Sequence, residues 1–371
     1  MAEPLLINLL PYRPVATGLS RYSERLLSGW QEATGLALPP QLRLRVDGMA
    51  ELGRDGNLAP EQHSRRMRWL QANALVQHAV PVARLVREAN PAVIYSPYTD
   101  RLLAVRDRPQ IITCHDLIPL HCPNSRRAYW RSRLWLPRHL QGATMVIAIS
   151  RAVADLLIAD GLPSERIAVI PNGVEPVSDP IHAPASEDVL LLARHAPNKN
   201  VALALEGFAR LLELEPRWMG RLRIVGGAGP HSRALRALAD RLGVSARVDW
   251  IAHLSPQALE HRWRSSFCLL STSRMEGFDY PLFEAQARGL PTLASRIPVH
   301  EELHGESALL FDLDDGGVNL ATVWQRLARD PSLWLQLSQT GLIHARSYSL
   351  KRQLQGLVQV IDQVAARGRW C

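Results

Sequence analysis

Cysteine is scarce in this chain of 371 residues, which has four: Cys114, Cys122, Cys268 and Cys371. They are scattered and contain no C-x-x-C pair, and the histidines beside Cys114 and Cys122 match no common zinc spacing. We therefore expect neither a disulfide framework nor a zinc finger, and a reducing cytoplasm is the simplest setting.

Long apolar runs are also missing, since no stretch approaches the roughly 20 apolar residues of a membrane span. The first ten residues lack the basic region of a signal peptide, and Pro11 ends their apolar run, which favours a buried first strand. Long charge blocks of one sign are absent too. With 47% hydrophobic and 21% charged residues, the chain is expected to fold into two globular domains.

The net charge of +8 indicates an anionic partner. Nucleic acid, an acidic membrane surface and a phosphorylated substrate all meet that demand. No nucleic-acid recognition motif accompanies the charge, so no nucleic-acid partner is expected.

Short apolar runs alternate with helical patterns along the whole chain, which predicts an α/β fold with parallel sheets. In the first half the expected strands are Leu5–Leu9, Leu42–Val46, Val93–Ser96, Ile111–Cys114, Thr144–Ile149 and Ile167–Ile170, and the expected helices are Leu19–Ala33, Ser64–Glu88, Arg126–Leu140 and Arg151–Ala159.

A segment rich in proline, 172–188, separates these elements from a second series. Its expected strands are Val189–Ala193, Leu222–Val225, Val248–Ile251, Phe267–Leu270, Thr292–Ser295 and Ala308–Phe311. The pattern predicts two Rossmann-like domains, 1–176 and 177–346. A terminal helix, 347–371, has no strand after it and is expected to return to the first domain.

The most informative segment runs from Ser273 to Ala285 and reads SRMEGFDYPLFEA. It follows a buried strand, and Pro281 stands where a helix begins, so it predicts a strand–loop–helix turn of the kind that binds ligands in α/β folds. Glu276 lies on the loop, and Glu284 lies near the end of the first helical turn, where it can accept two hydroxyl hydrogen bonds from a sugar.

This segment resembles the E-x7-E signature of the retaining glycosyltransferases of family 4, which adopt the GT-B fold. The match continues through Gly289 and Pro291. The resemblance implies that Glu284 holds the ribose of the donor, while Glu276 and the backbone after Gly277 hold the transferred sugar. It also implies an N-terminal acceptor-binding domain and a C-terminal domain that binds the nucleotide sugar.

Other landmarks of the family occur in the same order. Arg194 and Lys199 resemble its pair of cations that face the donor diphosphate. The glycines from Gly226 to Gly229 resemble its V-G-x-G turn. In the first half, the run from Thr17 to Tyr22 resembles the G-I-G-R-Y of a mannosyl- and rhamnosyl-transferring subgroup, and the run from Thr113 to Pro119 resembles its T-x-H-D-L-x-P.

The resemblance thus assigns a catalytic pair, His115 and Glu276, and a set of donor contacts: Gly18, Arg194, Lys199, Gly277, Phe278, Asp279, Tyr280 and Glu284. The resemblance also implies no cofactor and no metal, with cations and helix N-termini neutralising the departing diphosphate of a GDP- or UDP-linked sugar. The D-x-D of Asp312 and Asp314 is interpreted as a surface turn.

One departure from the family pattern concerns the sugar loop. Asp279 and Tyr280 stand where Gly-Leu is usual, and Asp279 is expected to place a carboxylate where backbone amides meet sugar hydroxyls. This departure keeps open a nucleotide-sugar-binding protein without turnover. A GT-B sugar-nucleotide epimerase is a second alternative to transfer of a mannose-like hexose to a glycan or lipid-linked acceptor.

A last pattern concerns location. The predicted helix over 126–140 interleaves five arginines with Tyr129, Trp130 and Trp135. Such a helix suits an anionic membrane surface, which would make the protein cytoplasmic and peripheral at the inner membrane face. The simpler interpretation is that both tryptophans pack on the sheet and the arginines are solvated.

Overall fold

The structure is a computed structural model, and it describes residues 5–12, 18–44, 50–54, 56, 79–313 and 315–367. The chain divides into two compact units. Unit 1 comprises Met1–Asp116, Trp130–Gly173 and Leu350–Cys371; unit 2 comprises Leu117–Tyr129 and Val174–Ser349.

Unit 1 is built on a seven-stranded sheet within the described residues. In spatial order its strands are β3 (Ala50–Gly53), β2 (Gln41–Leu44), β1 (Leu5–Asn8), β4 (Val93–Ser96), β5 (Gln110–Cys114), β6 (Met145–Ala148) and β7 (Ile167–Val169). Its helical elements are α1 (Gly18–Thr34), α4 (Ala79–Ala89), α7 (Arg151–Ala159), η1 (Ser164–Arg166), α15 (Leu350–Arg367) and most of α6 (Arg126–Gly142).

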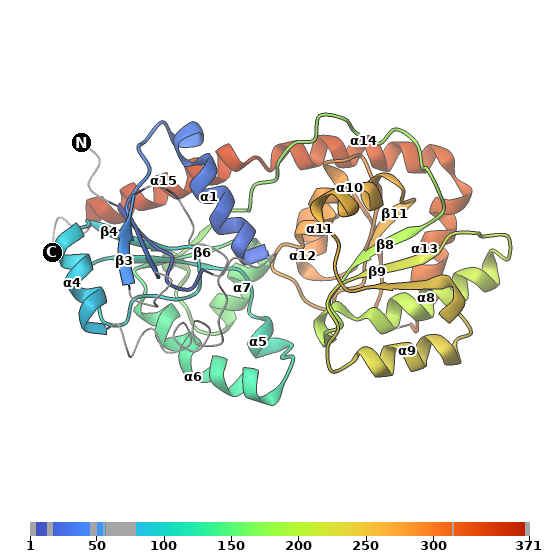
Figure 1. The fold of residues 1–371 in the computed structure, drawn as a ribbon, viewed down its shortest axis with the longest axis horizontal. Helices are drawn as coiled ribbons and strands as arrows, with labels where there is room; N and C mark the ends of the chain where they lie inside the picture. The colour runs from blue at the N-terminus through green and yellow to red at the C-terminus, as the bar shows by residue number, and fades with distance from the viewer. Residues whose placement is uncertain are drawn as a thin grey trace. The chain divides into compact units, whose positions relative to one another are not determined.

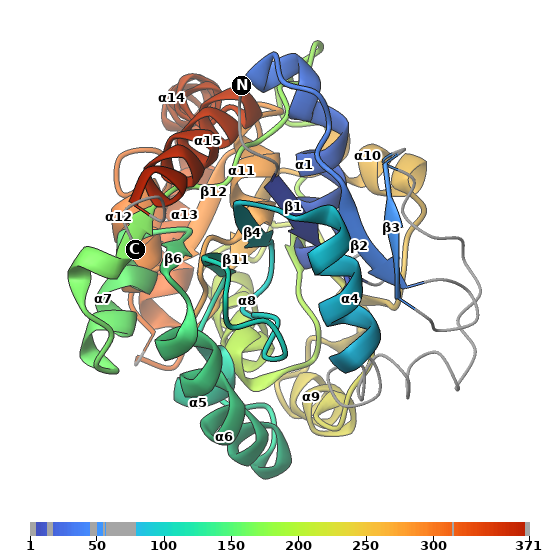
Figure 2. The same cartoon turned by 90° about the vertical axis from the view of Figure 1, so that its left-hand side faces the viewer.

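Helices cover both faces of this sheet (Figures 1 and 2). On one face, α1 and α15 lie side by side, and Trp30 and Leu357 share a core with Ile7 and Tyr95 of the central strands. On the other face, α4 packs against Leu6 and its neighbours. Coverage of both faces explains why the central strands are continuously apolar.

The terminal helix α15 therefore belongs to unit 1, although the chain reaches it from unit 2. Val174 and Ser349, where the chain passes between the units, pair as a parallel bridge, and Val174 N donates to the carbonyl oxygen of Tyr348 at 2.7 Å. On the unit 1 side, Gly173 N donates to Gln353 Oε1 at 2.6 Å.

Unit 2 is built on a six-stranded parallel sheet in the described chain. In spatial order its strands are β10 (Val248–Ile251), β9 (Leu222–Val225), β8 (Val189–Leu192), β11 (Cys268–Ser271), β12 (Thr292–Ser295) and β13 (Leu309–Phe311). Its helical elements are α5 (Ile118–His121), η2 (Pro197–Lys199), α8 (Val201–Leu214), α9 (Ser232–Arg241), η3 (Ser245–Arg247), α10 (Pro256–Arg264), α11 (Tyr280–Gln286), α12 (Pro298–His304), α13 (Val318–Arg329) and α14 (Pro331–Ser347).

The predicted α/β architecture with two parallel sheets is confirmed, and one strand was missed. β3 contains a single large apolar residue, Leu52, and it runs antiparallel to β2 at the sheet edge. An ion pair between Arg43 and Glu51 at 3.0 Å joins the two strands. The helix predicted over 64–88 lies partly outside the described residues, and its described part is α4.

Candidate active site

Two loops of unit 2 leave the sheet at the same edge. β8 and β11 are neighbouring parallel strands, so the loops after them begin side by side. Arg274 N donates to the carbonyl oxygen of Asn198 at 2.7 Å, and Thr272 Oγ1 donates to that of Lys199 at 3.0 Å. These bonds tie the loop that carries Lys199 to the loop that carries Glu276.

Lys199 and Glu276 form an enclosed ion pair at this edge. Lys199 Nζ lies 2.7 Å from Glu276 Oε1, a contact without the directed geometry of a hydrogen bond, and 3.7 Å from Asp279 Oδ1. The side chains of Lys199, Glu276 and Asp279 are 16%, 11% and 1% exposed. Two carboxylates thus share one ammonium group where water has little access.

The burial of this cluster shifts the pKa of each member. Burial alone would lower the pKa of Lys199, but the attraction of Glu276 and Asp279 outweighs it and raises the pKa. Burial raises the pKa of Glu276; Lys199 lowers it in part, and Asp279 raises it further. Burial opposes the charge of Asp279 as well, yet Lys199 and His300 hold the pKa of that carboxyl below its usual range. Asp279 is therefore the firmer anion of the two carboxyls.

Asp279 occupies a left-handed backbone conformation, with φ +59° and ψ +67°, immediately before α11. Glycine adopts this conformation at no steric cost and aspartate tolerates it, so the backbone that the Gly of the family pattern would give is kept. The side chain turns inward, where Oδ2 accepts from Ser271 Oγ at 2.5 Å and lies 3.1 Å from His300 Nε2. Inward partners thus bind the Asp279 carboxylate, and its contact with the donor sugar stays a prediction.

The other predicted contact residues of this segment are buried or half-buried. Phe278 is buried and stacks on Phe283 at 4.4 Å between ring centroids, so its backbone is what remains for a ligand. Gly277 precedes it, and Tyr280 opens α11. Glu284 lies on α11 and is largely buried, and its backbone carbonyl accepts from Arg288 at 2.9 Å.

Arg194 follows β8 directly and is exposed. It lies near enough to Lys199 for its charge to oppose the protonation of that ammonium. The neighbouring turn after β9 needs glycine at position 226, because a Cβ atom there would collide with the carbonyl of Ala193, the residue before Arg194. The V-G-x-G pattern thus reflects close packing of two loops at this edge.

Gly18 and His115 lie in unit 1. Gly18 begins α1 and is exposed, whereas Thr17 lies outside the described residues. His115 follows β5, and its Nε2 is 2.8 Å from the carbonyl oxygen of Pro97, with its ring edge-to-face on Tyr22 at 4.8 Å. A carbonyl oxygen only accepts, so Nε2 carries the proton and Nδ1 keeps its lone pair. That His115 and Glu276 act on one donor stays a prediction.

Burial lowers the pKa of His115 to about 4. In the unfolded chain the ring gains a proton below about pH 6.5, so between these values the unfolded state binds more protons. The free energy of unfolding should therefore fall as the pH drops from 6.5 to 4, and His115 should account for about 3 kcal/mol of the loss. Denaturant unfolding of the wild type and of His115→Gln at both pH values measures this share. An equal loss in both proteins would contradict it.

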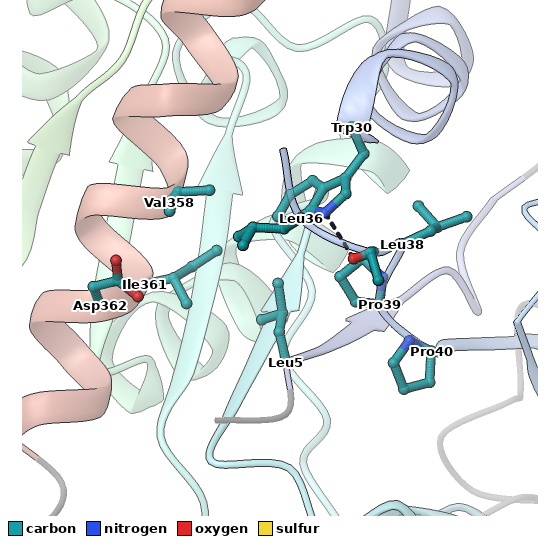
Figure 3. A pocket seen from close by; sticks show the side chains of 10 residues that line it. Leu5, Trp30, Leu36, Leu38, Pro39, Pro40, Val358, Ile361 and Asp362 are labelled. Atoms are coloured by element: carbon teal, nitrogen blue, oxygen red, sulfur yellow. Dashed lines mark hydrogen bonds between the residues drawn. The ribbon is translucent and has the colours of Figure 1, made fainter. Parts of the chain in front are cut away.

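A pocket of about 260 Å³ in unit 1 is lined by none of the predicted site residues (Figure 3). Trp30, Leu36 and Pro39 line it together with residues of α15. It adjoins Leu5 at the start of β1 and the segment before β2, so it lies at the amino ends of the strands. Ligands of α/β sheets bind at the carboxyl ends, and we assign the pocket no role in catalysis.

The exposed face of α6 differs from the simpler prediction. Trp130 is 66% exposed, Leu134 51% and Trp135 44%. The prediction that both tryptophans pack on the sheet is therefore wrong. The helix contains no acidic residue. Its exposed positions also include all five arginines: Arg126, Arg127, Arg131, Arg133 and Arg138.

Metal ligands are not gathered anywhere in the part of the chain that is described, where no group of three or more His, Cys, Asp or Glu side chains is placed to hold an ion. Asp312 pairs with Arg296 at 3.0 Å, and Asp314 lies outside the described residues. None of the described helices has the length and hydropathy of a membrane-spanning segment.

Solved structures show which fold class this is. Sucrose-phosphate synthase from Thermosynechococcus elongatus superposes with a TM-score of 0.75 at 19% identity, covering 98% of this chain and 100% of that one. HepE from Anabaena, in complex with UDP and glucose, superposes with a TM-score of 0.72 at 16% identity, covering 97% and 100%. Together with the two α/β units and the returning α15, these likenesses define the GT-B fold.

The sequence matches the family models described as Glycosyltransferase Family 4, over residues 49–177, and Glycosyl transferases group 1, over residues 180–315. O-antigen chain mannosyltransferase RfbU of Salmonella typhimurium is 25% identical over 84% of this chain and 87% of its own length. Exopolysaccharide phosphotransferase SCO2592 of Streptomyces coelicolor is 33% identical over 47% of this chain, but the match spans only 18% of that protein. The chain belongs to the GT-B glycosyltransferases of family 4 and is a glycosyltransferase.

Proposed function

We propose that this glycosyltransferase transfers a hexose, with mannose as the first candidate, from a nucleoside diphosphate sugar to an acceptor hydroxyl in glycan or polysaccharide synthesis, and that the anomeric configuration is retained. The observation that carries the proposal is the enclosed Lys199–Glu276 pair beside the left-handed turn that opens α11. Mannose is favoured by the mannosyltransferase name of RfbU.

In this proposal Arg194 and Lys199 bind the diphosphate and stabilise it as it leaves, which is the work that a metal ion does in other transferases. The loop from Gly277 to Tyr280 contributes backbone N–H groups, because its side chains point into the core or continue into α11. Glu284 binds the ribose, and Glu276 contacts the transferred sugar. His115, uncharged near neutral pH, offers Nδ1 as a hydrogen-bond acceptor.

GDP-mannose and UDP-glucose are the first donors to test, the second because HepE was solved with UDP and glucose. Each donor is incubated with the protein, with and without a panel of glycan and lipid-linked acceptors, and the anomeric configuration of the product is read by proton NMR. Acceptor-dependent transfer with retention supports the proposal. Conversion of the donor sugar without an acceptor would indicate the epimerase instead, and donor binding without turnover would indicate the non-catalytic binder.

We further propose that the exposed face of α6 binds an anionic membrane surface. Arginine near an anionic leaflet contributes about 1 kcal/mol per charge, and interfacial tryptophan favours the headgroup level. The protein is therefore expected to co-sediment with vesicles that contain phosphatidylglycerol, and added salt should weaken the binding. Vesicles of phosphatidylcholine alone serve as the neutral comparison.

The variant that tests this face is the double substitution Trp130→Ser/Trp135→Ser, which keeps every arginine. A matched control replaces Met219, an exposed apolar residue of unit 2, by Ser. Only the tryptophan variant is expected to lose vesicle binding. Absence of wild-type binding at low salt would refute the membrane proposal and favour an acceptor in solution.

A further inference from the structure

His300 lies on α12 and is completely enclosed by protein. Its Nδ1 is 2.8 Å from the carbonyl oxygen of Ser295 and 3.2 Å from Ser295 Oγ. The carbonyl only accepts, and Ser295 Oγ already donates its own proton to the carbonyl of Ser273 at 2.6 Å. Both acceptors therefore require a proton on Nδ1 of His300.

The other ring nitrogen faces a carboxylate. His300 Nε2 lies 3.1 Å from Asp279 Oδ2, the oxygen that also accepts from Ser271 Oγ. Lys199, 3.7 Å from Asp279 Oδ1, favours the ionised form of Asp279. A lone pair on Nε2 would meet an anion, so the geometry requires a proton on this nitrogen as well.

The surroundings of His300 contain further titratable groups. His304, on the same helix, lies 6.2 Å away between ring centroids, and His344 of α14 lies 5.5 Å beyond His304. Burial, together with the charges of His300 and His344, lowers the pKa of His304 well below its usual value. Asp279, from the loop before α11, is the acidic group in contact with His300. Of the three histidines, His300 is therefore the one that an adjacent carboxylate favours in the charged form.

We propose that His300, buried beneath the loop that precedes α11, carries a proton on both ring nitrogens, and that it positions Asp279 and, through Asp279, Lys199. The charges alternate along the chain of contacts from His300 to Asp279, Lys199 and Glu276. Asp279 is central to this series of contacts, because its backbone forms the left-handed turn and its carboxylate contacts both Lys199 and His300. The effect on donor binding rests on the proposed function of Lys199, whereas the protonation of His300 does not.

The protonation is tested by nitrogen NMR of the whole protein labelled with ¹⁵N-histidine, with His300→Gln used to assign the signal. Near neutral pH, both ring nitrogens of His300 are expected at the shifts of a protonated imidazolium. A neutral ring with an unprotonated Nε2 would overturn the proposal. In that case the proton between His300 Nε2 and Asp279 Oδ2 would belong to Asp279, or there would be no proton between these two atoms. This result is independent of whether any donor binds.

The positioning role is tested with Asp279→Asn, which tolerates the left-handed backbone but carries no charge, and with His300→Gln. Both variants are expected to raise the KM for the donor about tenfold, equivalent to the loss of one moderate interaction, with a smaller change in kcat. His304→Leu is the matched control on the same helix and should leave the KM for the donor unchanged.

Circular dichroism and thermal unfolding show whether each variant is folded, and if His300→Gln does not fold, Asp279→Asn decides. Folded variants with wild-type KM for the donor would overturn the positioning role. If the wild type binds no nucleoside diphosphate sugar in calorimetry, the proposed function fails, and the NMR result still decides the protonation of His300.

Discussion

Replacing Glu276 by Gln is expected to lower kcat about 100- to 1000-fold, the usual loss when one preorganised electrostatic contact to a transition state is removed. Glutamine has nearly the same shape, and Lys199 keeps Asp279 as an ionic partner, so the loop should stay in place. The KM for the donor should change little, because the lost contact acts on the developing charge of the sugar. Steady-state kinetics with saturating acceptor measure both constants.

Glu284→Gln is the matched comparison, since it also neutralises an enclosed carboxyl eight positions further along. If Glu284 binds the ribose, this variant should raise the KM for the donor more than it lowers kcat. A Glu276→Gln variant with wild-type kcat would exclude Glu276 from the reacting sugar. Equal losses in both variants would argue for a general effect on the loop.

Replacing Lys199 by Met is expected to weaken binding of the nucleoside diphosphate by about 1.5–3 kcal/mol, the strength of a hydrogen bond to a charged group. The same variant should also lose about 3–5 kcal/mol of stability, because it removes the ammonium group that the buried carboxyls of Glu276 and Asp279 share and leaves Glu276 unpaired. Since acid protonates these carboxyls, the stability difference from the wild type should shrink at low pH. Calorimetric titration with GDP and UDP and denaturant unfolding measure the two effects.

Arg194→Ala separates the two effects, because Arg194 is exposed and its removal should weaken diphosphate binding with little change in stability. Unchanged nucleotide affinity in both variants would remove the diphosphate assignment. A loss of affinity in Lys199→Met alone would assign the diphosphate to Lys199 and leave Arg194 as a surface cation.

Much of the fold could be predicted because most of its strands are short, largely apolar runs between polar turns. β4 and β12 have the predicted bounds and are buried along their whole length. β9 and β10 also have the predicted bounds, although each contains one charged residue, Arg223 and Asp249. The edge strand β3 carries little apolar signal, and its pairing with β2 depends on where the rest of the sheet lies.

The site shows the same division. The motif around Glu276 and the cation at Lys199 could be placed at one sheet edge, because parallel strands bring their carboxyl ends together. The direction of the Asp279 side chain could not be predicted. His300, 21 positions later, was not singled out by the sequence, and it meets Asp279 only when β11 and β12 pair.

The sequence by itself determined the alternation of strands and helices, the division into two halves, the family, and the charged residues of the loop between β11 and α11. Each of these depends on local pattern and spacing. Only the tertiary structure decided which of those charges meet, that Asp279 turns away from the loop surface, and that Trp130 and Trp135 remain exposed. The physical reason is that burial and charge pairing are set by side chains distant in sequence. A one-dimensional pattern shows which groups are available but not which partner desolvates or neutralises each of them.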